Sequence, residues 1–213
     1  MDLVLGQRGS ADADAAKTTL KRVAIGLARS IAARRFVGKK ILIIGCGSDF
    51  DECCLPIVGS LRRQKIEVHT RCYWVDFDAA ADVLGDDIAL VSQEYSDGEG
   101  QYDLAVVLTA IPSPVFLDAI LQRLMELDRP GQIEVAPFFI ADAARTAITS
   151  RYTGVALAND QGQPLVDGRQ ATSFHAALSD LLARPRRYFR HMPESIDAVL
   201  TGRDFEPDSA FTI

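Results

Sequence analysis

The sequence has little of what membrane-spanning, secreted or disulfide-stabilised proteins require. No apolar run approaches the roughly 20 residues of a membrane span, and the first residues lack the basic and apolar stretches of a signal peptide. Four cysteines among 213 residues are too few for a disulfide framework and are expected to be reduced thiols. We therefore expect the protein to reside in the cytoplasm and to make no contact with membranes.

Positive charge is also in short supply. The 23 Lys and Arg residues are outnumbered by 29 Asp and Glu residues, which gives a formal net charge of −6. Because a large nucleic-acid interface needs a basic surface, nucleic acid is not an expected partner, whereas a small phosphorylated ligand needs only a local site. One basic-aromatic cluster, with Tyr188 and Phe189 between its arginines, predicts a salt-bridged surface or a subunit contact, with phosphate or RNA binding as the alternative. Its arginines are Arg184, Arg186, Arg187 and Arg190.

Complete catalytic motifs are missing as well. The sequence has no G-x-x-x-x-G-K-[ST], no H-E-x-x-H and no G-x-S-x-G, which argues against phosphate-loop ATPases, zinc proteases and common serine hydrolases. The cysteines and histidines do not have the spacing of zinc ligands, so no metal-binding residues are predicted among them. Cys46 precedes an expected helix, where a thiol can become reactive, but a buried structural thiol is the expected role.

Apolar residues make up 48% of the chain, which is enough for one well-buried core at this length. We expect one domain over residues 16–202, between loose tails at residues 1–15 and 203–213. Continuous apolar runs predict strands buried on both faces, as in a parallel sheet covered by helices; they lie at residues 41–44, 103–108 and 132–140. Further strands are predicted at residues 67–74 and 88–91, and a hairpin at 152–168.

Apolar residues at helical spacing predict helices at 17–36, 51–63, 115–127, 173–182 and 194–200. Pro56 falls inside the second helix, and since proline suits a first turn, we expect that helix to begin near Cys54 or Leu55. The alternating order predicts an α/β fold with a single three-layer domain, a mainly parallel central sheet, and a C-terminal hairpin with helices.

The first candidate site is the glycine turn after the strand at 41–44. Glycines allow backbone amides to approach a phosphate, and a following helix N-terminus adds positive potential. The third glycine of a dinucleotide fingerprint would fall at Phe50, which is not glycine. Two alternatives stay open: a Rossmann enzyme using S-adenosylmethionine or a nicotinamide cofactor, and a tight turn without a ligand. The candidate residues are Gly45, Cys46, Gly47 and Ser48.

The second candidate site follows the strand at 103–108. Hydroxyl groups beside a helix N-terminus can hold a phosphate, and ligands of such folds gather at the carboxyl ends of strands. The alternative is a helix start that is capped by Ser113 and has Pro114 at the first helical position. The candidate ligand-binding residues here are Thr109, Ala110 and Ser113.

Three segments together resemble type I phosphoribosyltransferases, especially the purine salvage branch. They are LARSIAARRFVGKKILIIGCGSDFDECCLPIVGSL, GQYDLAVVLTAIPSPVFLDAILQRL and IEVAPFFIADAARTAITSRYTGVALANDQGQPLVDGR. The resemblance covers about residues 20–170 and rests on order, spacing and hydrophobic pattern. It implies a nucleotide or other phosphorylated ligand, bound after the second segment's strand, with Mg²⁺ as the candidate cofactor.

The chain departs from that family at the residues that matter for catalysis. The family's adjacent acidic pair would fall near Leu108 and Thr109, neither of which is acidic, and Pro112 and Pro114 remove amide donors from the phosphate stretch. The resemblance therefore implies a relative with weak or lost transferase activity that binds a nucleotide or serves as an assembly subunit, with a protein partner or a homo-oligomer. A Rossmann-type enzyme and a noncatalytic partner-binding protein remain the alternatives, so whether the chain is an enzyme stays open.

Overall fold

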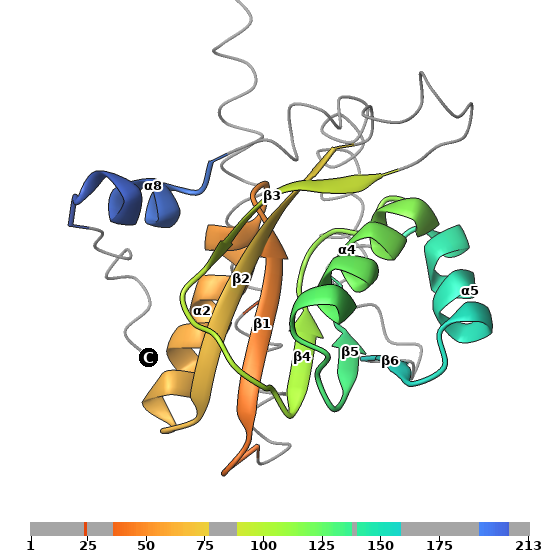
Figure 1. Cartoon of the computed structure of the whole chain (residues 1–213), viewed down its shortest axis with the longest axis horizontal. Coiled ribbons are helices and arrows are strands. Elements are labelled where there is room, and N and C mark those ends of the chain that lie inside the picture. The colour runs from red at the N-terminus through yellow and green to blue at the C-terminus, as the bar shows by residue number, and fades with distance from the viewer. Residues whose placement is uncertain (1–23, 25–35, 77–88, 138–139, 159–191, 205–213) are drawn as a thin grey trace, which may run out of the picture.

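Six strands form one mixed sheet in the computed structural model, which describes residues 24, 36–76, 89–137, 140–158 and 192–204 (Figure 1). The strand order is β3-β2-β1-β4-β5-β6. All pairings are parallel except that of β3 with β2. The strands are β1 (Lys40–Cys46), β2 (Glu67–Asp76), β3 (Leu90–Ser96), β4 (Leu104–Val107), β5 (Ile133–Val135) and β6 (Val155–Leu157). The α/β class and the mainly parallel sheet are as predicted.

Helices cover both faces of this sheet. Alternate residues of β1 explain why: Ile41 and Ile43 belong to one apolar cluster and Leu42 and Ile44 to the other, all fully buried. On the first face lies α2 (Phe50–Arg63), with Ile196 of α8 (Glu194–Thr201) in the same cluster. On the second face lie α4 (Pro114–Leu127) and α5 (Asp142–Arg151). The strand at 41–44 is therefore buried on both faces, as predicted.

The start of α2 differs from the prediction. The helix begins at Phe50, not near Cys54 or Leu55, and contains Pro56 in its interior. Proline removes one amide donor from a helix, but the apolar stripe of α2 packs on β1 and β2 and outweighs that loss. The first turn is also fixed by the backbone, because the Cys53 amide donates to the Asp49 carbonyl at 2.9 Å.

The segment after β5 was only partly anticipated. The predicted strand at 132–140 is much shorter, ending at Val135, and α5 was not predicted. β6 pairs in parallel with β5 and so belongs to the main sheet. The second strand of the predicted hairpin lies outside the described residues.

Several other predictions also fall outside the described residues. These are nearly all of the helix at 17–36, the helix at 173–182, the arginine cluster, and the tails apart from residues 203 and 204. Within the described part of the chain, no helix combines the length and apolar character needed to cross a lipid bilayer.

Candidate functional site

The two candidate loops meet at the carboxyl edge of the sheet, because β1 and β4 are neighbouring parallel strands. Asp49, at the end of the first loop, joins them. The hydroxyl of Thr109 donates to both carboxylate oxygens of Asp49, at 3.0 Å each. The backbone amide of Ala110 donates to Oδ2 of Asp49 at 2.9 Å. Sequence reasoning selected both loops but not the residue that connects them.

The Asp49 carboxyl group is completely buried. Burial raises its pKa from an ordinary 3.8 to about 7; hydrogen bonds from Ala110 and Thr109 oppose that rise, and the charge of Glu52 adds to it. Neutral donors solvate a buried carboxylate only partly, so its charged form is disfavoured relative to water. Asp49 therefore changes its charge near neutral pH.

The glycine turn directs its polar groups inward. The amide of Gly47 donates to the carbonyl of Tyr73 at 3.1 Å, and the amide of Asp49 donates to the carbonyl of Cys46 at 3.1 Å. A Cβ atom on Gly45 would lie 2.4 Å from Sγ of Cys54, so this glycine allows α2 to pack closely on β1. The hydroxyl of Ser48 is buried and has no hydrogen-bond partner. The residue as a whole is only partly buried.

Four thiols surround the Asp49 junction: Cys46, Cys53, Cys54 and Cys72, all free and buried. Burial raises the pKa of each thiol, and the charge of Asp49 raises it further. A reactive cysteine needs a lowered pKa. The structure therefore gives Cys46 the surroundings of an inert structural thiol, the role expected for it.

Ser113 begins α4. Its hydroxyl accepts a hydrogen bond from the Phe116 amide at 3.4 Å, and Pro114 is the first helical residue. This is the capped helix start considered as one alternative, and such a cap satisfies one of the amides that a helix N-terminus leaves without a partner. Ser113 is itself half-buried. Its role in ligand binding stays a prediction.

The start of α8 adds a third element to this edge. Both the backbone amide of Ser195, at 3.2 Å, and its hydroxyl donate to the carboxylate of Asp51 in the first turn of α2. Figure 1 shows α8 beside the start of α2. The helix predicted at 194–200 is thereby attached to the element that follows the glycine turn.

The described residues do not fit a magnesium site. No group of three or more His, Cys, Asp or Glu side chains among them could hold a metal ion. Mg²⁺ binds through accessible carboxylate oxygens together with water and ligand phosphates, but Asp49 is sealed from solvent and already accepts three hydrogen bonds. We therefore assign no catalytic step to a metal here.

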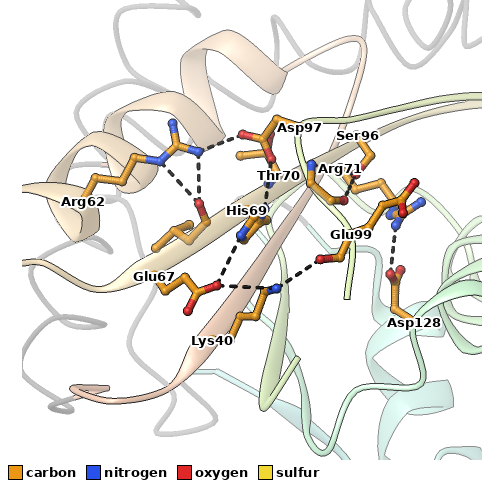
Figure 2. Close-up of polar contacts among 12 residues, drawn as sticks. Lys40, Arg62, Glu67, His69, Thr70, Arg71, Ser96, Asp97, Glu99 and Asp128 are labelled. Atoms are coloured by element: carbon orange, nitrogen blue, oxygen red, sulfur yellow. Dashed lines mark hydrogen bonds and ion pairs between the residues drawn. The ribbon is translucent and has the colours of Figure 1, made fainter. Parts of the chain in front are cut away.

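A second polar network lies across β2 and the turn that follows β3 (Figure 2). Arg62 donates to Oδ2 of Asp97 at 2.7 Å, and Oδ1 of Asp97 accepts from the Thr70 amide at 2.5 Å. The backbone of Gly98 lies so close to His69 that a Cβ atom there would be 1.6 Å from Nδ1 of the ring. The hydrogen bonds of Asp97 to Arg62 and Thr70 hold the turn after β3 against β2 and α2.

Deeper in the same view, Arg71 and Asp128 form an ion pair at 2.8 Å between β2 and the C-terminal end of α4 (Figure 2). Their side chains are only 8% and 3% exposed. A buried pair of this kind fixes one element relative to another, and removal of one partner leaves an uncompensated charge.

No family model matches the sequence, and no curated protein is similar to it. Solved structures are similar to it, however. A hypoxanthine phosphoribosyltransferase from Staphylococcus aureus is 11% identical over 66% of this chain and 73% of its own, with a TM-score of 0.40. A hypoxanthine-guanine phosphoribosyltransferase from Bacillus anthracis is 15% identical over 66% and 78%, with a TM-score of 0.37. The AQ2163 protein from Aquifex aeolicus is 11% identical over 71% and 82%, with a TM-score of 0.48.

The chain resembles phosphoribosyltransferases. The resemblance predicted from three sequence segments is thus found again among solved structures. At such identities and TM-scores it does not decide what this site binds, which has to come from the side chains themselves.

Proposed function

We propose that this phosphoribosyltransferase-like protein binds the phosphate group of a nucleotide or another phosphorylated ligand at the carboxyl edge of its sheet, with weak or no transferase activity. The observation that carries the proposal is the orientation of Asp49. The loop after β4 has no carboxylate of its own between Leu108 and Ser113, and the carboxylate that reaches this loop is buried between the strands.

The electrostatics of the site argue against transfer of a ribosyl group. Transfer of a ribosyl group develops positive charge on the sugar and negative charge on the leaving pyrophosphate, so a transferase needs exposed charges aimed at both. A completely buried carboxyl group with a pKa of about 7 cannot face a sugar or hold a metal in that way. The groups that favour phosphate binding are uncharged donors, the hydroxyls of Ser48 and Ser113. The first turn of α4 adds little, because Pro114 has no amide to donate and the Phe116 amide already donates to Ser113.

The inward amides of Gly47 and Asp49 disfavour a Rossmann enzyme, because such an enzyme presents the amides of this turn to its cofactor. A second candidate function, assembly with another protein or a second copy, is favoured by two adjacent apolar side chains on α8. Val199 and Leu200 are 61% and 65% exposed. Light scattering of the purified protein tests that role, and a monomer at all concentrations would contradict self-assembly.

Calorimetry with phosphoribosyl pyrophosphate and a panel of nucleotides, with and without Mg²⁺, tests the binding proposal. Measuring the release of pyrophosphate in the presence of purine bases tests whether the protein has transferase activity. We expect binding of a phosphorylated ligand, little dependence on Mg²⁺, and release at the background rate. Mg²⁺-dependent turnover would contradict lost catalysis, and failure of every phosphorylated ligand to bind would contradict the binding role.

A matched pair of serine variants locates the ligand. Ser113→Ala removes the hydroxyl at the start of α4, whereas Ser150→Ala removes an exposed hydroxyl that donates only within α5. We expect weaker binding in the first variant and unchanged binding in the second. Equal binding in both would place the ligand away from the start of α4.

A further inference from the structure

We propose that the Asp49 junction is a pH-sensitive switch: it stays closed around an uncharged Asp49 and opens more often once Asp49 carries a charge. The junction consists of the Asp49 side chain together with Thr109 and Ala110, which hold it from the loop after β4. This inference goes beyond the proposed function, because the junction opens and closes whether or not a ligand is present. Only its consequence for ligand binding rests on that function.

The closed junction excludes water from the Asp49 carboxyl group. Three donor-acceptor contacts of 2.9 to 3.0 Å join the loop after β1 to the loop after β4. Asp49 and Thr109 are 0% exposed and Ala110 is 1% exposed. The carboxyl group can therefore be hydrated only when the two loops separate, so whatever favours its hydration also favours opening of the junction.

The titratable groups around Asp49 do not favour a negative charge there. Among the described residues, those that interact with it are one carboxyl group and four thiols, and the loop after β4 adds only neutral donors. They are Cys46 of β1, Glu52, Cys53 and Cys54 of α2, and Cys72 of β2. A buried charge that is not paired with an opposite charge is disfavoured. Charging Asp49 therefore destabilises the closed junction relative to an open one.

The opening equilibrium should therefore depend on pH. In the closed junction the pKa of Asp49 is about 7, whereas the hydrated carboxyl group of an open junction should have the ordinary value of 3.8. Between these values the closed state binds a proton that the open state has released, so the open fraction rises with pH and levels off above the closed-state pKa. From about pH 5 to about pH 8, linkage predicts roughly a hundredfold rise in the opening constant.

The switch bears on the proposed ligand site because the loop after β4 leads into α4. Ser113, whose hydroxyl the binding proposal uses, lies three positions after Ala110 in that loop. A ligand that needs the closed arrangement of the loop binds in proportion to the closed fraction. Its affinity should therefore fall at high pH to the extent that the junction is open.

Hydrogen exchange of the Ala110 amide tests the proposal, followed by ¹⁵N-correlated NMR of the full chain without ligand from about pH 5 to about pH 8. This amide donates to Asp49 at 2.9 Å, so its exchange requires an open junction. The Ala105 amide donates to the Gln132 carbonyl and reports unfolding of the sheet. Wild type is compared with Asp49→Asn, and Asp142→Asn is the matched control because Asp142 is exposed.

After correction for the pH dependence of exchange in an unstructured chain, the opening constant of Ala110 should rise roughly a hundredfold in wild type and in Asp142→Asn, and stay constant in Asp49→Asn. At each pH the Ala110 amide should be less protected than the Ala105 amide. Thr109→Val removes a hydrogen bond that lowers the pKa of Asp49, so the rise should level off at a higher pH. Its matched control, Thr146→Val, removes an exposed hydroxyl of α5 and should leave the profile unchanged.

A flat profile for wild type, or the same rise in wild type and Asp49→Asn, would overturn the switch. Equal protection of the Ala110 and Ala105 amides would overturn it too, because exchange would then require unfolding of the sheet. If Asp49→Asn does not fold, Thr109→Val decides, and an unchanged profile in that variant counts against the switch. Because the test contains no ligand, flat profiles leave the binding proposal standing, and failure of phosphorylated ligands to bind in calorimetry leaves the switch standing.

Discussion

Asp49→Asn should remove a pH dependence from the stability of this protein. In the folded chain the pKa of Asp49 is about 7, against an ordinary value of 3.8. Between these two values the native state binds a proton that the unfolded state has released, so stability falls as pH rises. The favourable contribution is complete below the unfolded pKa and is lost as pH rises through the folded pKa. Asn has no such proton to lose.

Linkage gives the size of the effect. Each unit of pKa difference corresponds to about 1.4 kcal/mol, so the full difference is worth about 4 kcal/mol. The part that lies between about pH 4.5 and about pH 8 is about 3 kcal/mol. Asn retains an acceptor for the Ala110 amide, and its own amide can donate to the Thr109 hydroxyl, so the variant should fold.

Urea unfolding at several pH values measures this change. The free energy of unfolding of Asp49→Asn minus that of wild type should rise by about 3 kcal/mol between about pH 4.5 and about pH 8. The difference between Asp142→Asn and wild type should stay nearly flat over the neutral range, because Asp142 is exposed. Parallel profiles for wild type and Asp49→Asn would refute the reasoning, since they would mean that Asp49 titrates alike in the folded and unfolded chain.

Four further experiments, three substitutions and one chemical labelling, test other parts of the fold. Gly98→Ala should lower stability by about 2 kcal/mol in urea unfolding, because its methyl group overlaps the His69 ring. Gly59→Ala in α2 meets no atom closer than 3.6 Å and should raise stability by about 0.5 kcal/mol or more; a loss would show that α2 is not helical there. Asp128→Ala should cost about 3 kcal/mol, because it leaves Arg71 buried without its closest partner; a cost below 1 kcal/mol would indicate that the pair is solvated. A thiol reagent at about pH 8 should label none of the four cysteines until the chain is unfolded, because all four are buried; rapid labelling of the native protein would contradict that burial.

The elements whose patterns were local could be predicted from the sequence. A run apolar on both faces identified β1. Ser113 before α4 and Pro114 at its first position identified the start of that helix, because a cap and a first-turn proline act within one helical turn. α5 has a weaker apolar face, formed by Ala144, Ala147 and Ile148. The apolar run at residues 132–140 predicted a long strand there, so the start of α5 directly after it was missed.

The hydrogen bonds between Asp49 and Thr109 could not be predicted, because the two residues are 60 positions apart in the sequence. Asp49 reads in sequence as an ordinary residue between a turn and a helix. It becomes a site residue only when β1 and β4 are known to be neighbours. Gly45 was selected for a different reason from the one the structure gives: the turn suggested room for a ligand, whereas the missing side chain makes room for the Cys54 thiol.

The strand order bears on how the chain can assemble during synthesis. β1 is the first of the described strands to be made and occupies an interior position of the sheet. Each strand that emerges later adds to an edge already present: β2 and then β3 on one side, and β4, β5 and β6 on the other. No described strand has to insert between two neighbours that have already paired. The sheet can thus grow outward in the order of translation, and its earliest strand ends at the loop that carries Asp49.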